Sequence, residues 1–332
     1  DSFTFTGGLA TTAAGGTVTV AGTLATTDTQ MDLGAVTLGA DTVLATGTAS
    51  TSLLNTGAVT SAGHALTLDS GPDAAADLTV ASFGGGGALT VRDSGGTTFA
   101  GAVTAGAVTL TDTTGAITFA DDLTAQSLAE GTESFDLLLT GSTTRVTHPV
   151  TLARVGTLTL GDGDSDSLTF AGGLDASGVS QTNLHGTLVT TDTALRLGAL
   201  ETKGASTLRS GSAITTVATL TDAANGALTL GDSSQTGTFR FTGNAVMDDA
   251  SLSTAAAPFA VEFLGASNEF ASATTFTNTG TVRFGDASTD STTFTAGVDT
   301  TATSGTTLAG TLATTDSALD LGAVTLAADG TL

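Results

Sequence analysis

The sequence predicts an all-β protein, a right-handed parallel β-helix (β-solenoid) with coils of roughly 18–21 residues. Three observations favour this fold class. One phrase recurs over long distances, short runs alternate apolar residues with threonine, and turn-forming residues interrupt these runs every few positions. A stack of equivalent coils accounts for such a repeat, because each coil buries its apolar side only against its neighbours.

The repeated phrase is Gly22-Thr-Leu-Ala-Thr-Thr-Asp28, which returns at 186–192 and 310–316 with a single change of alanine to valine. Each copy runs on into Leu-Gly-Ala and follows a lead-in of the form Asp-Ser-x-Thr-Phe. The copies start at residues 22, 186 and 310, so their offsets are 164 and 124 residues. A shorter Leu/Phe-Gly-Asp phrase starts at residues 160, 230 and 284. These distances lie near multiples of about 18 residues, which is a solenoid period.

The middle of the chain indicates the coil length directly. Apolar residues there form three columns with an 18-residue step: Phe99, Ile117 and Phe135; Leu110, Leu128 and Val146; Phe119, Leu137 and Val155. Side chains that share a column are expected to stack in successive coils. The same columns argue against a helix over 121–135, the only stretch rich in helix-tolerant residues.

Within each coil the local pattern is typical of strands. Runs such as Phe3-Thr-Phe5, Val18-Thr-Val20 and Leu158-Thr-Leu160 alternate apolar and polar residues with a period of two. Gly, Asp, Asn and Ser separate the runs, as turns require. We expect three strands per coil, each paired in parallel with its equivalent in the next coil. A β-sandwich or an up-and-down barrel is the main alternative, but neither explains columns held in one register.

Composition excludes several functions. The chain has no Cys, Trp or Tyr, a single lysine at Lys203, and a net charge of −24 spread along 332 residues. No disulfide or thiol chemistry is therefore available. Without a basic patch, neither a nucleic acid nor an anionic membrane surface is an expected partner. No apolar run is long enough to span a membrane.

We predict that residues 1–332 form one continuous solenoid, without a linker. The repeat phrases at both ends predict that it is a segment of a longer repetitive protein, or that copies stack head to tail. Two irregular regions are expected to be local. Ser70–Asp77 would form a bulge, and Gly84–Gly87 a tight loop that lacks the following helix of a phosphate-binding loop.

The best ligand candidate is Gly161-Asp-Gly-Asp-Ser-Asp-Ser167. Asp162, Asp164 and Asp166 alternate as in a calcium loop, which predicts a possible Ca²⁺ site that would stiffen the rod. The loop lacks the glycine and the glutamate that an EF-hand places at positions six and twelve. An exposed polar turn is the competing interpretation, supported by related turns at Asp232 and at 286–290.

Other candidates suggest weaker hypotheses. The acidic pairs Asp121-Asp122, Asp248-Asp249 and Glu130 with Glu133 could act on a polysaccharide as acid and base, but the seven arginines are scattered and aromatic sugar platforms are absent. His64, His148 and His185 stand far apart, so neither a catalytic triad nor a zinc site is expected. Thr17-Val-Thr19 and Thr275-Phe-Thr277 are similar to the threonine arrays of ice-binding solenoids, yet they do not recur in each coil. We therefore predict no enzyme.

The phrases Gly-Thr-Leu-Ala-Thr-Thr-Asp, Gly-Ala-Val-Thr-Leu and Ser-Leu-Thr-Phe-Ala-Gly-Gly-Leu resemble the β-strand repeats of filamentous-haemagglutinin-like bacterial surface adhesins. The resemblance covers nearly the whole chain but brings no catalytic or binding motif. It implies a right-handed β-helix, export across a Gram-negative envelope, and an adhesive or structural role in a fibre at the cell surface. The implied partners are neighbouring repeats or copies of the same chain, and a receptor or glycan on a host or cell surface.

Overall fold

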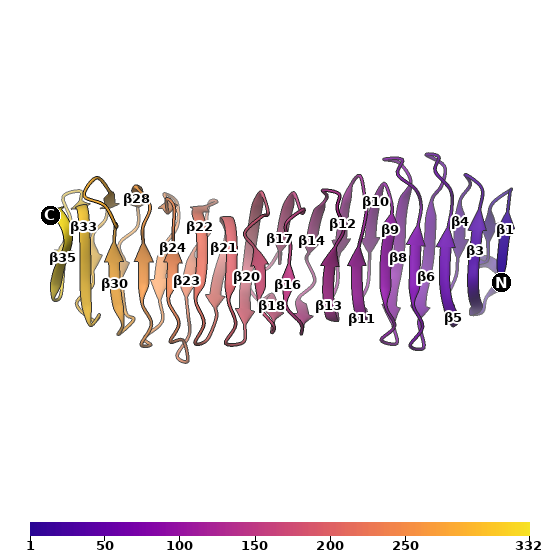
Figure 1. The fold of residues 1–332 in the computed structure, drawn as a ribbon, viewed down its shortest axis with the longest axis horizontal. Helices are drawn as coiled ribbons and strands as arrows, with labels where there is room; N and C mark the ends of the chain where they lie inside the picture. The colour runs from indigo at the N-terminus through magenta and orange to yellow at the C-terminus, as the bar shows by residue number, and fades with distance from the viewer. The chain divides into compact units, whose positions relative to one another are not determined.

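The computed structural model describes residues 1–332 apart from the side chain of Ala14. Its described residues form β-strands and one short 3₁₀ helix, η1 (Thr12–Ala14), without an α-helix. The strands stack in parallel in about 16 turns, so the predicted β-solenoid is confirmed. Figure 1 shows this stacking of strands within each part of the chain. Among the described residues, no helix has the length and hydropathy that a membrane crossing would need.

The contacts divide the chain into two compact units. Unit 1 contains Asp1–Thr159 and unit 2 contains Leu160–Leu332, so the boundary falls within β17 (Thr157–Leu160). Each unit is described by itself below. The prediction of one continuous solenoid over the whole chain stays a prediction.

Each coil of unit 1 has three sides, named faces A, B and C in chain order. Face A contains β1 (Ser2–Phe5), the second halves of β3 (Val18–Thr26), β5 (Val36–Ala45), β11 (Val103–Leu110) and β13 (Leu123–Glu130), and β7 (Leu66–Asp69), β9 (Leu89–Asp93) and β16 (Val150–Thr151). Face B contains β2 (Leu9–Ala10), β4 (Met31–Leu33), the first halves of β6 (Leu54–Thr60) and β8 (Asp77–Gly84), β10 (Gly96–Phe99), β12 (Ala116–Phe119) and β14 (Asp136–Leu139). Face C contains the remaining halves of the longer strands and β15 (Thr143–Val146).

Unit 2 repeats this design with faces D, E and F. Face D contains β19 (Leu174–Ala176), the first parts of β21 (Leu195–Arg209), β22 (Thr215–Asp222), β33 (Gly305–Thr314) and β35 (Val324–Thr331), and β24 (Phe239–Phe241), β27 (Val261–Phe263) and β30 (Thr281–Phe284). Face E contains the first part of β20 (Gln181–Thr190), the middle of β21, the ends of β22, β33 and β35, and β25 (Val246–Met247), β28 (Ser267–Phe270) and β31 (Ser291–Phe294). Face F contains β18 (Ser167–Phe170), the ends of β20 and β21, β23 (Leu228–Leu230), β26 (Leu252–Thr254), β29 (Thr274–Thr275), β32 (Val298–Asp299) and β34 (Leu319–Asp320).

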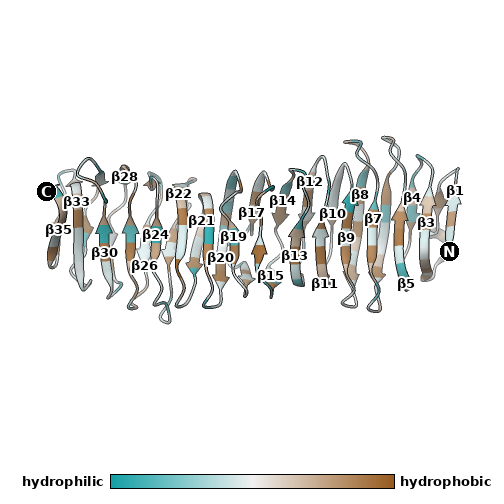
Figure 2. Cartoon of the chain, in the orientation of Figure 1, coloured by the Kyte–Doolittle hydropathy of each residue, from teal (hydrophilic) through white to brown (hydrophobic). Residues whose placement is uncertain are grey.

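The core of each unit is a set of apolar columns inside the coils. Alternate residues of a strand point inward, so Leu188, Leu208 and Leu230 follow one another in successive coils and are fully buried. Figure 2 shows the resulting alternation of brown and pale residues along the strands. In unit 2 a column of phenylalanines runs through Phe241, Phe263 and Phe284, whose neighbouring rings stack with centroids 4.9 Å and 6.1 Å apart.

The coil length differs from the sequence prediction. Paired residues are separated by 18 positions for Val18 and Val36 but by 24 for Ser267 and Ser291, so some coils exceed 21 residues. The three predicted columns with an 18-residue step are wrong: Phe99 pairs with Phe119 and Ile117 with Leu137, a step of 20. The stretch 121–135 contains β13 and, as predicted, no helix.

The long repeat is out of phase with the coil. In unit 2, the copy of the phrase that starts at Gly186 lies on face F, where Thr187 pairs with Thr207. The copy that starts at Gly310 lies on face E, where Thr311 pairs with Ser291. The 124 residues between them therefore span five full coils and two further faces. The unit that repeats is a strand with its turn, which is one third of a coil.

Candidate functional site

The acidic loop predicted to bind calcium precedes β18 at the corner between faces E and F. Its last carboxylate, Asp166, is 6% exposed and points back into the loop. Asp166 Oδ2 accepts hydrogen bonds from the backbone N–H groups of Asp162 and Gly163, both at 2.8 Å. Asp290 accepts from Asp286 and Ala287 in the same way at 2.8 Å. The recurrence at a second corner indicates that these aspartates organise turns.

Asp164 in the same loop takes part in a clasp that connects three successive coils. Its Oδ1 atom lies 2.6 Å from His185 Nε2 and accepts the backbone N–H of Ala205 at 3.0 Å. A side chain at Gly204 would place its Cβ 2.1 Å from His185 Nε2, so the imidazole lies directly against that glycine. The hydrogen bond from His185, followed by that from Ala205, lowers the pKa of Asp164.

The calcium hypothesis gains no geometric support. Asp166 is directed into its own turn, Asp164 is directed to His185, and Asp162 is exposed. Among the described side chains, no three His, Cys, Asp or Glu residues are grouped so that they could hold a metal ion. The site at Asp162, Asp164 and Asp166 stays a prediction from sequence.

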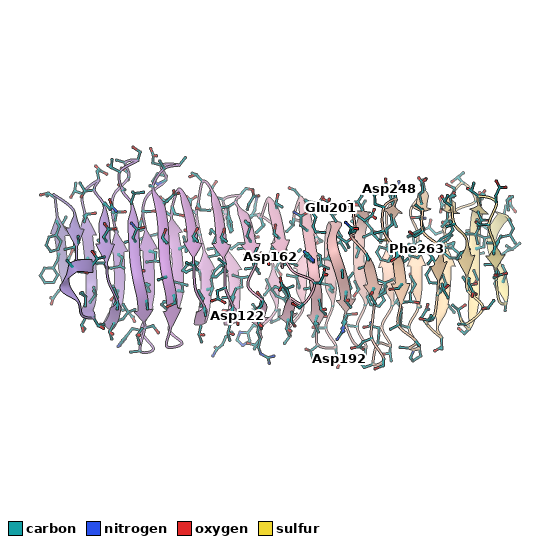
Figure 3. All side chains as sticks on the ribbon, turned by 180° about the vertical axis from the view of Figure 1, so that it is seen from behind. Asp122, Asp162, Asp192, Glu201, Asp248 and Phe263 are labelled. Carbon is teal, nitrogen blue, oxygen red and sulfur yellow. The ribbon has the colours of Figure 1, made fainter. Side chains whose placement is uncertain are left out.

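Two members of the acidic pairs proposed as acid and base, Asp122 and Glu130, link neighbouring coils through their carboxylates. Asp122 Oδ1 accepts the backbone N–H of Thr143 at 2.8 Å, and Glu130 Oε1 accepts that of Arg154 at 2.9 Å. In unit 2 the carboxylate of Asp222 accepts the N–H groups of Asp248 and Asp249 at 3.1 Å and 3.2 Å. Figure 3 shows the labelled Asp192 and Asp248 at opposite edges of the unit 2 ribbon, where the turns lie. The hypothesis that these pairs act as acid and base on a polysaccharide stays a prediction from sequence.

The predicted separation of the histidines holds within unit 1. His64 Nδ1 lies 3.8 Å from Asp41 Oδ1, whereas the backbone N–H of His148 donates to Gln126, four coils further along unit 1. The loop Gly84–Gly87 is a turn, since Gly85 and Gly86 have φ angles of 97° and 74°. A Cβ at Gly87 would lie 1.8 Å from the carbonyl oxygen of His64, so this glycine allows close packing between coils.

Three of the seven arginines, which are scattered along the sequence, form one outward row on face D. The row is set by strand register and contains Asp175, Arg196, Thr216, Arg240, Glu262, Arg283 and Thr307. Arg240 Nε lies 2.5 Å from Glu262 Oε2. Side chains at paired positions of neighbouring strands interact in this way, so this ion pair links two neighbouring coils of face D. Only the register, which the sequence does not reveal, brings these residues together.

Threonine and serine occupy other outward rows. On face F the row contains Ser167, Thr187, Thr207, Thr229 and Ser253, with the hydroxyl groups of the last two 3.0 Å apart. The ice-binding pattern does not extend from Thr275, which is followed in register by Asp299 and Asp320. In unit 1, Thr19 is followed in register by Thr37 and Thr60, and then by Gly84.

Two hollows differ in character. In unit 1, a hollow of about 250 Å³ beside β1 is lined by apolar side chains that include Phe3, Phe5 and Leu9. In unit 2, a polar hollow of about 210 Å³ lies between Asp192, Arg209 and Asp232. Arg209 Nη1 is 3.5 Å from Asp232 Oδ2, so the cation of this second hollow is already paired.

No family model, no curated protein and no solved structure matches this chain. The resemblance to filamentous-haemagglutinin-like adhesins therefore rests on the repeat phrases alone.

Proposed function

We propose that this chain is a structural and adhesive segment of an extracellular β-solenoid fibre on the surface of a Gram-negative bacterium. The observation that carries the proposal is the repeated outward row, with one side chain per coil, as in Ser167, Thr187 and Thr207 on face F. Such a row presents the same small polar group at intervals of about 4.8 Å. Weak contacts repeated along a fibre add up by multivalency, which suits adhesion to a receptor or glycan on another surface.

The charge distribution supports the same function. The chain has a net charge of −24, and many of its carboxylates link coils through backbone N–H groups, as Asp28 does with Thr48 and Asp192 with Ser212, both at 2.8 Å. Acidic side chains at the corners keep an elongated surface soluble and discourage lateral aggregation. The fibre would extend by stacking coil upon coil, with neighbouring repeats of the same chain or with further copies.

Surface display tests this proposal. The chain would be fused to an outer-membrane anchor in a non-adherent bacterium, and attachment to epithelial cells and to a glycan array would be counted. We expect attachment above that of the anchor alone. The control carries Leu188→Asp and Leu208→Asp, which place charges in the buried column and should abolish both the fold and the attachment.

A chain that is displayed, folded by circular dichroism and no more adherent than its core-disrupted control would contradict the adhesive proposal. Running the assay in calcium and in chelator also tests the calcium hypothesis, since a stiffened rod should attach better with calcium. Assaying released reducing ends from the same glycans tests the polysaccharide-cleaving alternative, for which we expect no product.

A further inference from the structure

The polar hollow of unit 2 lies at a corner, directly after successive strands of face F. Its volume is about 210 Å³, and its walls come from the ends of β20 and β21 and from the turn after β23. Asp192, Arg209 and Asp232 supply its charges. Thr191 and Ser234 supply hydroxyl groups. Sites for small molecules combine a concave shape with a few convergent polar groups, and this hollow has both features.

Both carboxylates of the hollow are held in place by hydrogen bonds from nearby turns. Asp192 Oδ1 accepts the backbone N–H of Ser212 at 2.8 Å. Asp232 Oδ1 accepts the backbone N–H and the hydroxyl of Ser234 at 2.8 Å and 2.6 Å. The backbone of Ser212 lowers the pKa of Asp192, and the hydroxyl of Ser234 lowers the pKa of Asp232, so both are ionised at neutral pH. A carboxylate has about four acceptor positions, so each can still accept a hydrogen bond from a ligand.

The ion pair with Asp232 uses only part of the Arg209 guanidinium. Arg209 Nη1 lies 3.5 Å from Asp232 Oδ2, and the arginine side chain is 41% exposed. Its Nε atom is buried and has no hydrogen-bond partner among the described residues. A guanidinium has several N–H donors, and a buried donor without a partner lowers stability. The hollow therefore contains a donor group that the fold itself does not satisfy.

The first copy of the long phrase shows that this kind of corner forms without the arginine. In unit 1 the corner is held by Asp28, which accepts the N–H of Thr48 at 2.8 Å, as the equivalent aspartate does in unit 2. The residue paired with the fourth position of the phrase is Ala45 in unit 1 and Arg209 in unit 2. Because the same turn forms beside an alanine, the guanidinium is an addition that the corner does not need.

The charges of the hollow favour an uncharged ligand that is rich in hydroxyl groups. Two carboxylates beside one guanidinium repel an anion. A hydroxyl group both donates and accepts, so neighbouring hydroxyl groups of a sugar can donate to a carboxylate and accept from a guanidinium. Val189 in the wall is half-buried and offers an apolar contact to the C–H groups of a sugar ring. The volume suits one sugar ring, since larger ligands need about 300 Å³ or more.

The hollow lies beside the row of hydroxyl groups on face F. Val189 and Arg209 are paired in register, and they lie two residues beyond Thr187 and Thr207 in the same strands. Residues two apart in a strand point to the same side, so all four side chains point outward on this face. A glycan whose terminal ring fills the hollow can therefore continue over the hydroxyl row.

We propose that this hollow binds the terminal, uncharged sugar of a glycan. Arg209 donates hydrogen bonds to hydroxyl groups of the ring, and Asp192 and Asp232 accept hydrogen bonds from them. The inference rests on the proposed function, since it names a site and a class of ligand through which the fibre adheres.

Ligand-observed NMR titrations of the whole chain test this proposal. The probes are the methyl glycosides of glucose, galactose, mannose and N-acetylglucosamine, with glucuronic acid and glucosamine as charged sugars for comparison. We expect a dissociation constant of about 1 mM for at least one neutral glycoside. Arg209→Ala, which introduces the residue found at the equivalent position of unit 1, should raise that constant at least about tenfold. The matched control is Arg196→Ala on face D, which should leave binding unchanged.

Binding of no neutral glycoside, or equal binding by the Arg209→Ala variant, would overturn the inference. Tighter binding of a charged sugar than of every neutral one would also overturn it. Binding that disappears in chelator would show that a divalent cation holds the sugar, which contradicts the role given to the guanidinium. Asp232→Asn keeps the shape of its side chain and repeats the test in case the arginine variant fails to fold, which circular dichroism would show.

The adhesion assay separates this inference from the proposed function. A chain that binds no single sugar, and that mediates attachment equally well with and without Arg209, would contradict only the sugar site. A chain that binds a neutral glycoside through Arg209 but mediates no attachment would contradict only the adhesive role.

Discussion

Aspartates in this chain have opposite effects on stability, according to what surrounds each carboxylate. Asp164 accepts hydrogen bonds from His185 and from the backbone of Ala205, which lower its pKa. Asp93 lies opposite Asp69 in the neighbouring coil, and its Oδ1 atom is buried without a hydrogen-bond partner. Burial, followed by the charges of Asp112 and Asp69, raises the pKa of Asp93. The two residues therefore make opposite predictions for the pH dependence of folding.

We predict that Asp164→Asn destabilises unit 2 at pH 7 and that this loss of stability becomes smaller as the solution is acidified. Because the folded-state pKa of Asp164 is lowered, its contribution is complete above the unfolded-state pKa of about 3.9 and is lost as the pH falls through the folded-state pKa. Thermal melting of the two proteins between pH 7 and pH 2 would show the difference in Tm closing. Asp162→Asn in the same loop is the control, and an equal loss for that variant would contradict the role of the clasp.

We predict that Asp93→Asn stabilises unit 1 at neutral pH. A raised folded-state pKa means that the ionised carboxylate opposes folding above this pKa, and that the cost disappears below the unfolded-state pKa of about 3.9. The side chain is only partly buried, so we expect a Tm increase of only about 1–3 °C at pH 7 and none at pH 3. A lower Tm at pH 7 would show that the charge of Asp93 is needed.

We predict that Phe263→Ala is among the most destabilising substitutions in unit 2. Its ring is fully buried, stacks between Phe241 and Phe284, and meets Phe270 edge to face. Removing a buried phenylalanine costs about 3–5 kcal/mol, including the cavity left behind. Urea unfolding, monitored by amide hydrogen exchange in unit 2, would measure the loss in the free energy of unfolding. Phe3→Ala, at a half-exposed ring, should change stability by less than about 1 kcal/mol.

Strand-plus-turn elements of the same sequence adopt the same conformation wherever they occur. In the three copies of the long phrase, the final aspartate has a φ angle of 52°, 52° and 51° at Asp28, Asp192 and Asp316. The threonine two positions earlier donates its hydroxyl to a carbonyl three residues on, as Thr190 does to Thr193 at 2.6 Å. Aspartate tolerates the left-handed region better than most residues, so the phrase encodes the corner as well as the strand.

We predict that Thr190→Val loosens this corner. Thr190 is 2% exposed, so valine fills the same space but leaves the Thr193 carbonyl without its donor, at a cost of about 1–2 kcal/mol. Faster amide exchange at the turn 191–194 would report the loss. Thr187→Val, whose side chain points outward on the same strand, is the control and should be nearly neutral. Equal effects of the two variants would show that the buried hydroxyl has no special role.

The sequence predicted strands, their threefold arrangement and their parallel stacking, but not their register. Inward positions recur every two residues, so a step of 18 pairs Phe99 with Ile117 and a step of 20 pairs it with Phe119, and both pairs are apolar. Only the lengths of the corners decide between them, and corners of Gly, Ser and Asp vary freely. The arginine row on face D was missed for this reason, because it exists only once the register is known.

The candidate site was less predictable than the fold. Alternating Asp162, Asp164 and Asp166 have the spacing of a cation loop, but their directions depend on contacts with other coils. His185 is 21 residues and Ala205 is 41 residues from Asp164, and neither position is marked by a motif. Local sequence therefore identified the loop and could not identify what its carboxylates bind.

At the scale of the whole molecule, the two copies of the phrase in unit 2 lie on different faces, at Thr187 on face F and at Thr311 on face E. A coil with three similar sides accepts the phrase on any face, because every strand has the same alternation of inward and outward residues. Where two segments of the chain are connected, the strand and its turn must therefore match, whereas the face of the coil on which they lie need not.

We predict that deleting residues 187–310 leaves a folded solenoid. The deletion removes a number of strands that is not a multiple of three, but it joins Gly186 to a strand and corner of nearly the same sequence. Leu319 would then lie over Leu174, where Leu195 lies now. Circular dichroism and a cooperative melt should show a β-solenoid. The control deletes residues 187–303, which breaks the phrase, and we expect this variant to misfold. A misfolded product of the 187–310 deletion, with a folded product of the control, would contradict the prediction.

This freedom of phase has a consequence for how such a gene can change. Unequal crossing-over between the two copies of the phrase in unit 2 would shorten or lengthen the protein by five and two-thirds turns, and each product would still bury its apolar columns along its length. Every exchange also rotates the downstream surface by one side relative to the upstream surface. Length and surface pattern can thus vary together in a single recombination event, while the core remains unchanged.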